Sequence, residues 1–163
     1  MRQPTLLLLL VCIAFSSFSC STDNMDENVD AITYTEAPQA KQIEIEILEL
    51  INNHRITIGL NPLTNMSDIK AQAYSHTNYM VDIGSVSHNG FHQRKNNLIA
   101  NVGATKVGEN VAYAYSSPAS VVNAWINSDT HRDVLEGDYT DFDISAEKDA
   151  DGRWYYTNIF IKK

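Results

Sequence analysis

The stretch Val107-Gly108-Glu109-Asn110-Val111-Ala112 lies at the centre of the sequence pattern that decides the fold. It places one carboxylate, Glu109, between two distant histidines, His88 and His131. Glu109 follows His88 by 21 residues and precedes His131 by 22, so only the tertiary fold can bring the three side chains together. Two imidazoles and a carboxylate in one cleft can ligate a divalent metal or move protons. These three residues are therefore the candidate metal or ligand cleft, and Glu109 is the candidate catalytic group if the protein is an enzyme.

The N-terminal residues indicate export. Arg2 supplies a positive charge, residues 6–14 form a short apolar run, and small residues lead into Cys20. This pattern is typical of a secretory signal peptide, expected over residues 1–19, and the apolar run is too short for a membrane span. Cys20 and the polar run after it resemble the lipidated start of a bacterial lipoprotein. The alternative is a soluble secreted protein in which Cys20 is incidental.

Composition limits the classes of function. Residues 20–37 are polar and acidic, which predicts a lipidated, disordered tether, and residues 38–163 are enough for one domain with one core. The two cysteines are Cys12 and Cys20, and Cys12 would leave with the signal, so the mature domain has no disulfide and depends on a packed core. Without Arg2 the chain carries 20 acidic and 11 basic residues, a net charge of about −9. No cluster of Lys and Arg is present, so we expect no nucleic-acid partner and membrane contact only through acyl chains on Cys20.

The order of the predicted elements indicates an α+β layered domain. Apolar spacing and end signals predict helices over residues 41–58, 67–83 and 91–99, and a further helix that starts at Ser117-Pro118. Strands are predicted over residues 142–147 and 154–161, joined by a turn at 149–152. Residues 108–115 are predicted to form a loop that enters a strand. A pattern that is rich in helices first and ends in a strand pair favours helices packed on a small antiparallel sheet.

Six short motifs follow one another along the chain. They are Leu50-Ile51-Asn52-Asn53-His54-Arg55 with Gly59-Leu60-Asn61-Pro62-Leu63; Ala71-Gln72-Ala73-Tyr74-Ser75-His76; Val86-Ser87-His88; Gly108-Glu109-Asn110-Val111-Ala112; Val122-Asn123-Ala124-Trp125-Ile126-Asn127-Ser128; and His131-Arg132-Asp133-Val134-Leu135. In this order the chain, from about Ile43 to Ile161, resembles the CAP superfamily (cysteine-rich secretory proteins, antigen 5 and pathogenesis-related proteins), also called the SCP domain. The resemblance is to its bacterial, disulfide-free branch.

The resemblance implies a three-layer α-β-α sandwich with a cleft of two histidines and up to two acidic residues. Several family members bind zinc or another divalent ion there, so the resemblance implies zinc or another divalent metal as the cofactor. Carried over by position, the cleft residues are His88, Glu109 and His131. The second acid of many relatives follows the helix tryptophan, where this chain has Asn127 and Ser128, so the complete set of four is not present.

Three further residues, Asn110, Asn127 and Ser128, are expected to surround and support this cleft. Asn110 belongs to the turn chemistry of the Gly-Glu-Asn stretch, and Ser128 can cap the short segment from His131 to Leu135. We expect Trp125 to pack between its helix and the sheet rather than to contact a ligand. The supporting set therefore combines local structure with contact to the cleft.

Three functions remain open at this point. The first is an exported CAP-domain lipoprotein that acts by binding a lipid, a glycan, a peptide or an envelope protein, at the outer membrane or cell surface of a bacterium or otherwise in the periplasm or medium. The second is a zinc-assisted hydrolase in which Glu109 is a metal ligand or general base. The third is a structural envelope protein with a vestigial cleft. Binding is favoured, because the missing second carboxylate leaves too few groups for metal, open position and base together.

Overall fold

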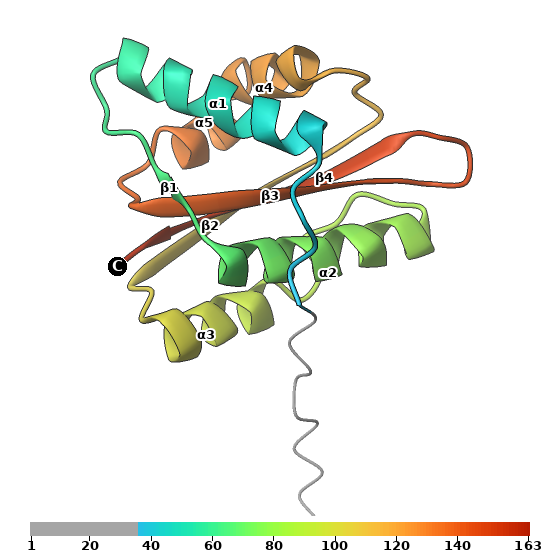
Figure 1. Ribbon diagram of the computed structural model, residues 1–163, viewed down its shortest axis with the longest axis horizontal. Helices are drawn as coiled ribbons and strands as arrows, with labels where there is room; N and C mark the ends of the chain where they lie inside the picture. Colours follow the sequence, from blue (N-terminus) through green and yellow to red (C-terminus); the bar gives the residue numbers. More distant parts are fainter. Residues whose placement is uncertain (1–35) are drawn as a thin grey trace, which may run out of the picture. The chain divides into compact units, whose positions relative to one another are not determined.

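A four-stranded sheet forms the middle layer of the computed structural model, which describes residues 36–163 (Figure 1). Its strand order is β1 (Thr64–Asn65), β3 (Asp141–Lys148), β4 (Trp154–Lys162) and β2 (Lys106–Tyr113). β2, β4 and β3 are antiparallel neighbours, whereas the two residues of β1 pair in parallel with β3. The expected signal peptide, Cys20 and nearly all of the tether lie outside the described residues, so those expectations stay predictions.

Helices cover both faces of this sheet (Figure 1). One face carries α1 (Gln42–Thr57), α4 (Pro118–Ile126) and α5 (Asp129–Leu135), and the other carries α2 (Ser67–Ile83) and α3 (Phe91–Val102). The structure therefore confirms the expected α+β sandwich of three layers. Within residues 36–163, no helix is long and apolar enough to cross a membrane.

The structure differs from the expectation first in the sheet: residues 108–110, expected in a loop with Asn110 as a turn residue, lie inside β2, and the parallel strand β1 makes the sheet mixed. The extended piece that ends at Leu63 is fixed by Asn52 on α1, whose side-chain amide donates to Leu63 O at 3.0 Å and accepts from Leu63 N at 2.8 Å. The next residue, Thr64, then donates its N–H to Thr140 O at 3.1 Å and enters the ladder with β3. A second difference is that α3 continues to Val102, where Gly103 at φ 73° ends it.

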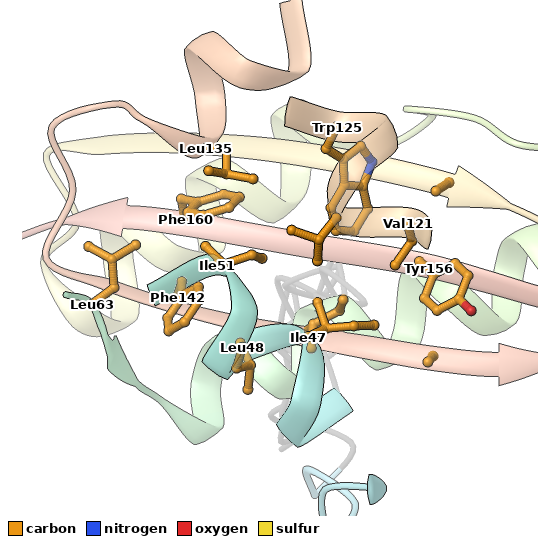
Figure 2. Close-up of a cluster of buried hydrophobic side chains, with 14 of the residues drawn as sticks. Ile47, Leu48, Ile51, Leu63, Val121, Trp125, Leu135, Phe142, Tyr156 and Phe160 are labelled. Carbon is orange, nitrogen blue, oxygen red and sulfur yellow. The ribbon is translucent and has the colours of Figure 1, made fainter. Parts of the chain in front are cut away.

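The larger part of the core lies between the sheet and the α1, α4 and α5 layer (Figure 2). Ile47 and Ile51 of α1 are fully buried there against strand residues Phe142, Tyr156 and Phe160. Figure 2 shows Trp125 beside Val121 over the same strands, and its Nε1 donates to Val111 O at 3.2 Å. Alternate residues of β4, including Ile159 and Ile161, face the α2 and α3 layer and form a second cluster.

The outer edge of β3 is closed by charged side chains beyond the short reach of β1. Lys70 of α2 donates from Nζ to Ile144 O at 2.7 Å, and Glu44 of α1 accepts from Ala146 N at 2.8 Å. Lys70 and Glu44 are both buried and form an ion pair with each other. Because they come from opposite helical layers, this pair also links the two layers across the sheet edge. The opposite edge, β2, borders the candidate site.

Candidate functional site

His88 and Glu109 are in direct contact in the structure. His88 lies in the loop between α2 and α3, Glu109 lies on β2, and the distance from His88 Nδ1 to Glu109 Oε1 is 2.8 Å. The carboxylate is 1% exposed, whereas the imidazole is 55% exposed. Since a carboxylate can only accept, Nδ1 carries the proton and Nε2 is left for another partner.

Arg94, in the first turn of α3, holds the same carboxylate and was not anticipated from the sequence. Its Nε lies 2.8 Å from Glu109 Oε2 and its Nη2 lies 2.8 Å from Oε1. Its Nη1 donates to Asn89 O at 2.8 Å, which ties the His88 loop to the pair. Such a bidentate arrangement is among the strongest side-chain contacts. Both Glu109 oxygens are therefore engaged.

A sequence signal for Arg94 did exist. Phe91, Arg94 and Leu98 are spaced at i, i+3 and i+7 and therefore share one helix face. Arg94 and Leu98 are both buried, so a guanidinium on this apolar face requires a carboxylate partner. That partner is Glu109.

His131 lies on α5 and is supported by two of the expected residues. Its Nδ1 is 2.8 Å from Ser128 Oγ, and its carbonyl accepts from Asn110 Nδ2 at 2.9 Å. Ser128 occupies the N-cap position of α5, but its hydroxyl faces His131 instead of capping the helix. The third expected residue, Asn127, donates to Asn123 O at 2.8 Å within its own α4 segment.

His131 lies where burial and the charge of His88 affect its protonation. Burial lowers the pKa of His131, and the positive charge that His88 can carry lowers it further. His131 is therefore biased towards the neutral form, in which an imidazole nitrogen can accept a proton or bind a metal. The described structure thus brings His88 into contact with Glu109 and His131 into the electrostatic range of His88.

A further histidine, His76 of α2, supports the loop that carries His88. Its Nε2 lies 2.6 Å from Ser87 O, and its ring stacks on Tyr79 with centroids 5.8 Å apart. Burial lowers its pKa, with a smaller contribution from the charge of Arg94. His76 is consequently a neutral donor that fixes the residue before His88. Of the other histidines, His54 pairs with Glu136 at 2.8 Å and His92 is exposed.

The side-chain atoms that are free to coordinate a metal decide how well the site fits the expected zinc. Among residues 36–163, no three His, Cys, Asp or Glu side chains are grouped so as to hold a metal ion. Glu109 does not suit the role of third ligand, because Arg94 and His88 take both of its oxygens. The remaining donors are Nε2 of His88 and Nε2 of His131. Glu109 instead stands behind His88, where carboxylates commonly orient a metal-binding imidazole.

A groove of about 340 Å³ adjoins His88 and Glu109. Its floor is the β2 segment 107–109, and its walls are His88 and Phe91 on one side and Val134 and Tyr139 on the other. A Cβ on Gly108 would lie 2.4 Å from the Tyr139 hydroxyl oxygen, so only glycine lets this tyrosine pack over the strand. The groove therefore extends from His88 along the edge of β2, and His131 is not among the residues that line it.

Comparisons with known proteins agree with this architecture. The model of the cysteine-rich secretory protein family (CAP) matches residues 48–160, more than half of the chain. A membrane protein of Bacillus subtilis, YlbC, is 32% identical over 124 residues, which are 74% of this chain and 34% of that protein. The chain therefore spans about a third of the length of this relative.

Solved structures show the same fold. An outer surface protein of Borrelia burgdorferi has a TM-score of 0.65 at 21% identity, over 72% of this chain and 90% of that chain. An extracellular protein of Bacillus anthracis that contains an SCP domain has a TM-score of 0.63 at 26% identity, over 74% and 40%. A cysteine-rich secretory protein of Staphylococcus aureus has a TM-score of 0.60 at 24% identity, over 77% and 41%.

Proposed function

The chain belongs to the cysteine-rich secretory protein (CAP) family, and on that premise we propose that it is an exported protein that acts by binding, through a cleft around His88, Glu109 and His131. The observation that carries this proposal is the contrast in exposure at the His88–Glu109 contact. A buried, arginine-paired carboxylate fixes an imidazole that is 55% exposed. Ordering an exposed imidazole in one tautomer prepares its Nε2 for a ligand.

Export and attachment are supported by the N-terminal pattern and by the described relatives. The proteins similar to this chain include one from an outer surface, one extracellular protein and one membrane protein. We propose that this chain also lies outside the cytoplasm. It would be a lipoprotein whose acyl chains are attached to Cys20. Under this proposal the domain works at the bacterial envelope, and the tether determines how far it can reach.

The donor set supports binding over hydrolysis. Catalytic zinc sites use three protein ligands and leave one position for water. Here Glu109 is occupied by Arg94, so the two imidazoles would supply at most two ligands, His88 Nε2 and His131 Nε2. A divalent metal held in this way would complete its coordination with atoms of the bound ligand or with water. Its contribution would be to join the protein to a ligand, while Glu109 keeps His88 oriented.

Metal titration of the full chain, purified without chelator, tests this proposal. We expect one weak Zn²⁺ site by isothermal titration calorimetry, absent in His88→Ala and in His131→Ala. His92→Ala is the matched control, because His92 is exposed and outside the cleft. Unchanged Zn²⁺ binding in both cleft variants would show that the cleft does not bind metal. Turnover of peptide, ester or glycan substrates that chelator abolishes would favour the hydrolase instead.

A further inference from the structure

We propose that the outer edge of β2 binds an extended peptide, which adds to the sheet as a strand within the groove beside His88. This inference rests on the proposed function, that the protein acts by binding, and it names the class of ligand. It concerns the backbone of the groove floor, whereas the metal proposal concerns the two imidazoles. The two can therefore fail separately.

The hydrogen-bond alternation of β2 shows which backbone groups face outward. Ala114 donates its N–H to Trp154 O at 2.8 Å, and these two residues continue the antiparallel register of β2 and β4. In such a ladder every second residue points its N–H and C=O at the partner strand. The backbone N–H and C=O groups of the even-numbered residues of β2 therefore point at β4. Those of Val107, Glu109 and Val111 point away from it. The indole of Trp125 confirms this parity, because it donates to Val111 O from outside the sheet at 3.2 Å.

Trp125 covers one end of the edge, and the rest is open. Among the described residues, the N–H and C=O groups of Val107 and Glu109 have no hydrogen-bond partner. Glu109 as a whole residue is 7% exposed, Val107 is half-buried, and both residues line the groove. Polar backbone groups in such a position are costly unless a partner or water meets them. They offer two donors and two acceptors in a row.

The opposite edge of the sheet gives the contrast. At β3, the outward groups of Ile144 and Ala146 are met by Lys70 and Glu44, two buried charged side chains. Proteins commonly close their sheet edges in this manner to prevent pairing with other chains. This fold closes one edge with an ion pair and leaves the other open beside its candidate site. We therefore expect a bound partner to hydrogen-bond with the backbone groups of this open edge.

The shape of the groove favours one extended peptide as the partner over the sheet edge of another folded protein. Its walls rise on both sides of the edge, with His88 and Phe91 from the α3 side and Val134 and Tyr139 from the α5 side. An added strand alternates its side chains between the two faces of the sheet, and each wall would receive every second residue. A second copy of this chain would have to bring an edge that lies between walls of its own. A slender extended peptide reaches the floor without that conflict.

The charges of the groove indicate the composition of the peptide. The Glu109 carboxylate is neutralised by Arg94, and Lys106 lies at the other end with its Nζ 4.3 Å from the centre of the Tyr139 ring. Phe91, Val134 and the Tyr139 ring are largely apolar walls. Because each wall carries apolar residues, we expect apolar side chains on both faces of the peptide strand, and no Lys or Arg beside Lys106.

The test uses the purified full chain and a displayed library of random twelve-residue peptides. Peptides that are enriched are synthesised, and each backbone amide is N-methylated in turn. We expect binding to fall at least tenfold when alternate amides are methylated and to change little at those between, because only every second amide faces β2. Val107→Pro, which removes an outward N–H and spares the ladder to β4, should also weaken binding at least tenfold.

Val107→Ala is the matched control, since it loses the same side chain and keeps the N–H. Circular dichroism and thermal unfolding establish that both variants are folded; if Val107→Pro unfolds, the methylation pattern alone decides. No enriched peptide, an N-methylation profile without a period of two, or equal affinities of folded Val107→Pro and Val107→Ala would overturn the proposal. A dimer that Val107→Pro dissociates would assign the edge to a second copy instead. Zn²⁺ binding that persists without peptide binding would reject this inference and leave the proposed function in place.

Discussion

Arg94 and Glu109 form a bidentate ion pair in which the guanidinium is 10% exposed and the carboxylate 1%. The pair joins α3 to β2, and Arg94 also holds Asn89 O in the loop that carries His88. The orientation of the exposed imidazole therefore depends on a residue that does not touch it. This relationship is the reason for proposing that Glu109 orients His88 and does not itself bind a metal.

Arg94→Met should destabilise the protein strongly. The substitution removes the only guanidinium that compensates the buried Glu109 among the described residues, and an unpaired buried charge costs about 3–5 kcal/mol. Urea unfolding measures the loss of free energy. The double variant Arg94→Met/Glu109→Gln should recover part of it, because the charge is then absent. A loss below about 1 kcal/mol in Arg94→Met would contradict the assigned role of the pair.

The order of the elements and the position of Glu109 could be predicted from the sequence, whereas the role of Arg94 and the pairing of β1 could not. The element order could be predicted because apolar spacing marks helices and strands, and the motif resemblance placed Glu109 between the histidines. The role of Arg94 depends on the odd-numbered residues of β2 facing α3, a parity that becomes definite only once β2 is paired with β4. The parallel pairing of β1 likewise depends on the Asn52 amide, a contact between side chain and backbone that leaves no periodic trace.

Gly108→Ala should destabilise the domain and distort the groove. The added Cβ would lie 2.4 Å from the Tyr139 hydroxyl and 3.0 Å from Val134 Cγ1, and such overpacking costs about 1–3 kcal/mol. Combining it with Tyr139→Phe removes the closest atom, so the double variant should be more stable than the sum of the single effects predicts. Additive effects of the two substitutions on thermal unfolding would show that Tyr139 does not pack over Gly108 as described.

Asp143 gives a pH-dependent prediction. Burial raises its pKa to about 6, against about 3.9 in an unfolded chain. The folded state therefore keeps a proton that the unfolded state releases between about pH 4 and pH 6, and the stability associated with Asp143 falls as the pH rises through this window and is level above it.

Asp143→Asn removes this titration. The change that this substitution causes in the free energy of unfolding should therefore be more stabilising at pH 7 than at pH 4, by up to about 3 kcal/mol. Asp133→Asn is the control for the loss of one carboxylate, because Asp133 is exposed. Denaturant unfolding at both pH values measures the difference. An Asp143→Asn effect that is equal at pH 4 and pH 7 would contradict the raised pKa.

Lipidation predicts a change of cell fraction. In a bacterial host with a lipoprotein pathway, the chain should partition with membranes, and mass spectrometry should find acyl chains on Cys20. Cys20→Ser should release the protein into the soluble exported fraction, and Cys12→Ser should not, because Cys12 lies in the expected signal. A membrane-bound Cys20→Ser variant would require another form of attachment.

The most direct test of the cleft is an NMR titration of the histidine ring nitrogens with Zn²⁺. It uses the full chain at pH 7, where burial favours neutral His131. We expect Nε2 of His88 and Nε2 of His131 to shift together, while both Nδ1 atoms stay hydrogen-bonded and His54, His76 and His92 do not change. Shifts confined to other histidines, or no shift of His88 and His131, would contradict this expectation.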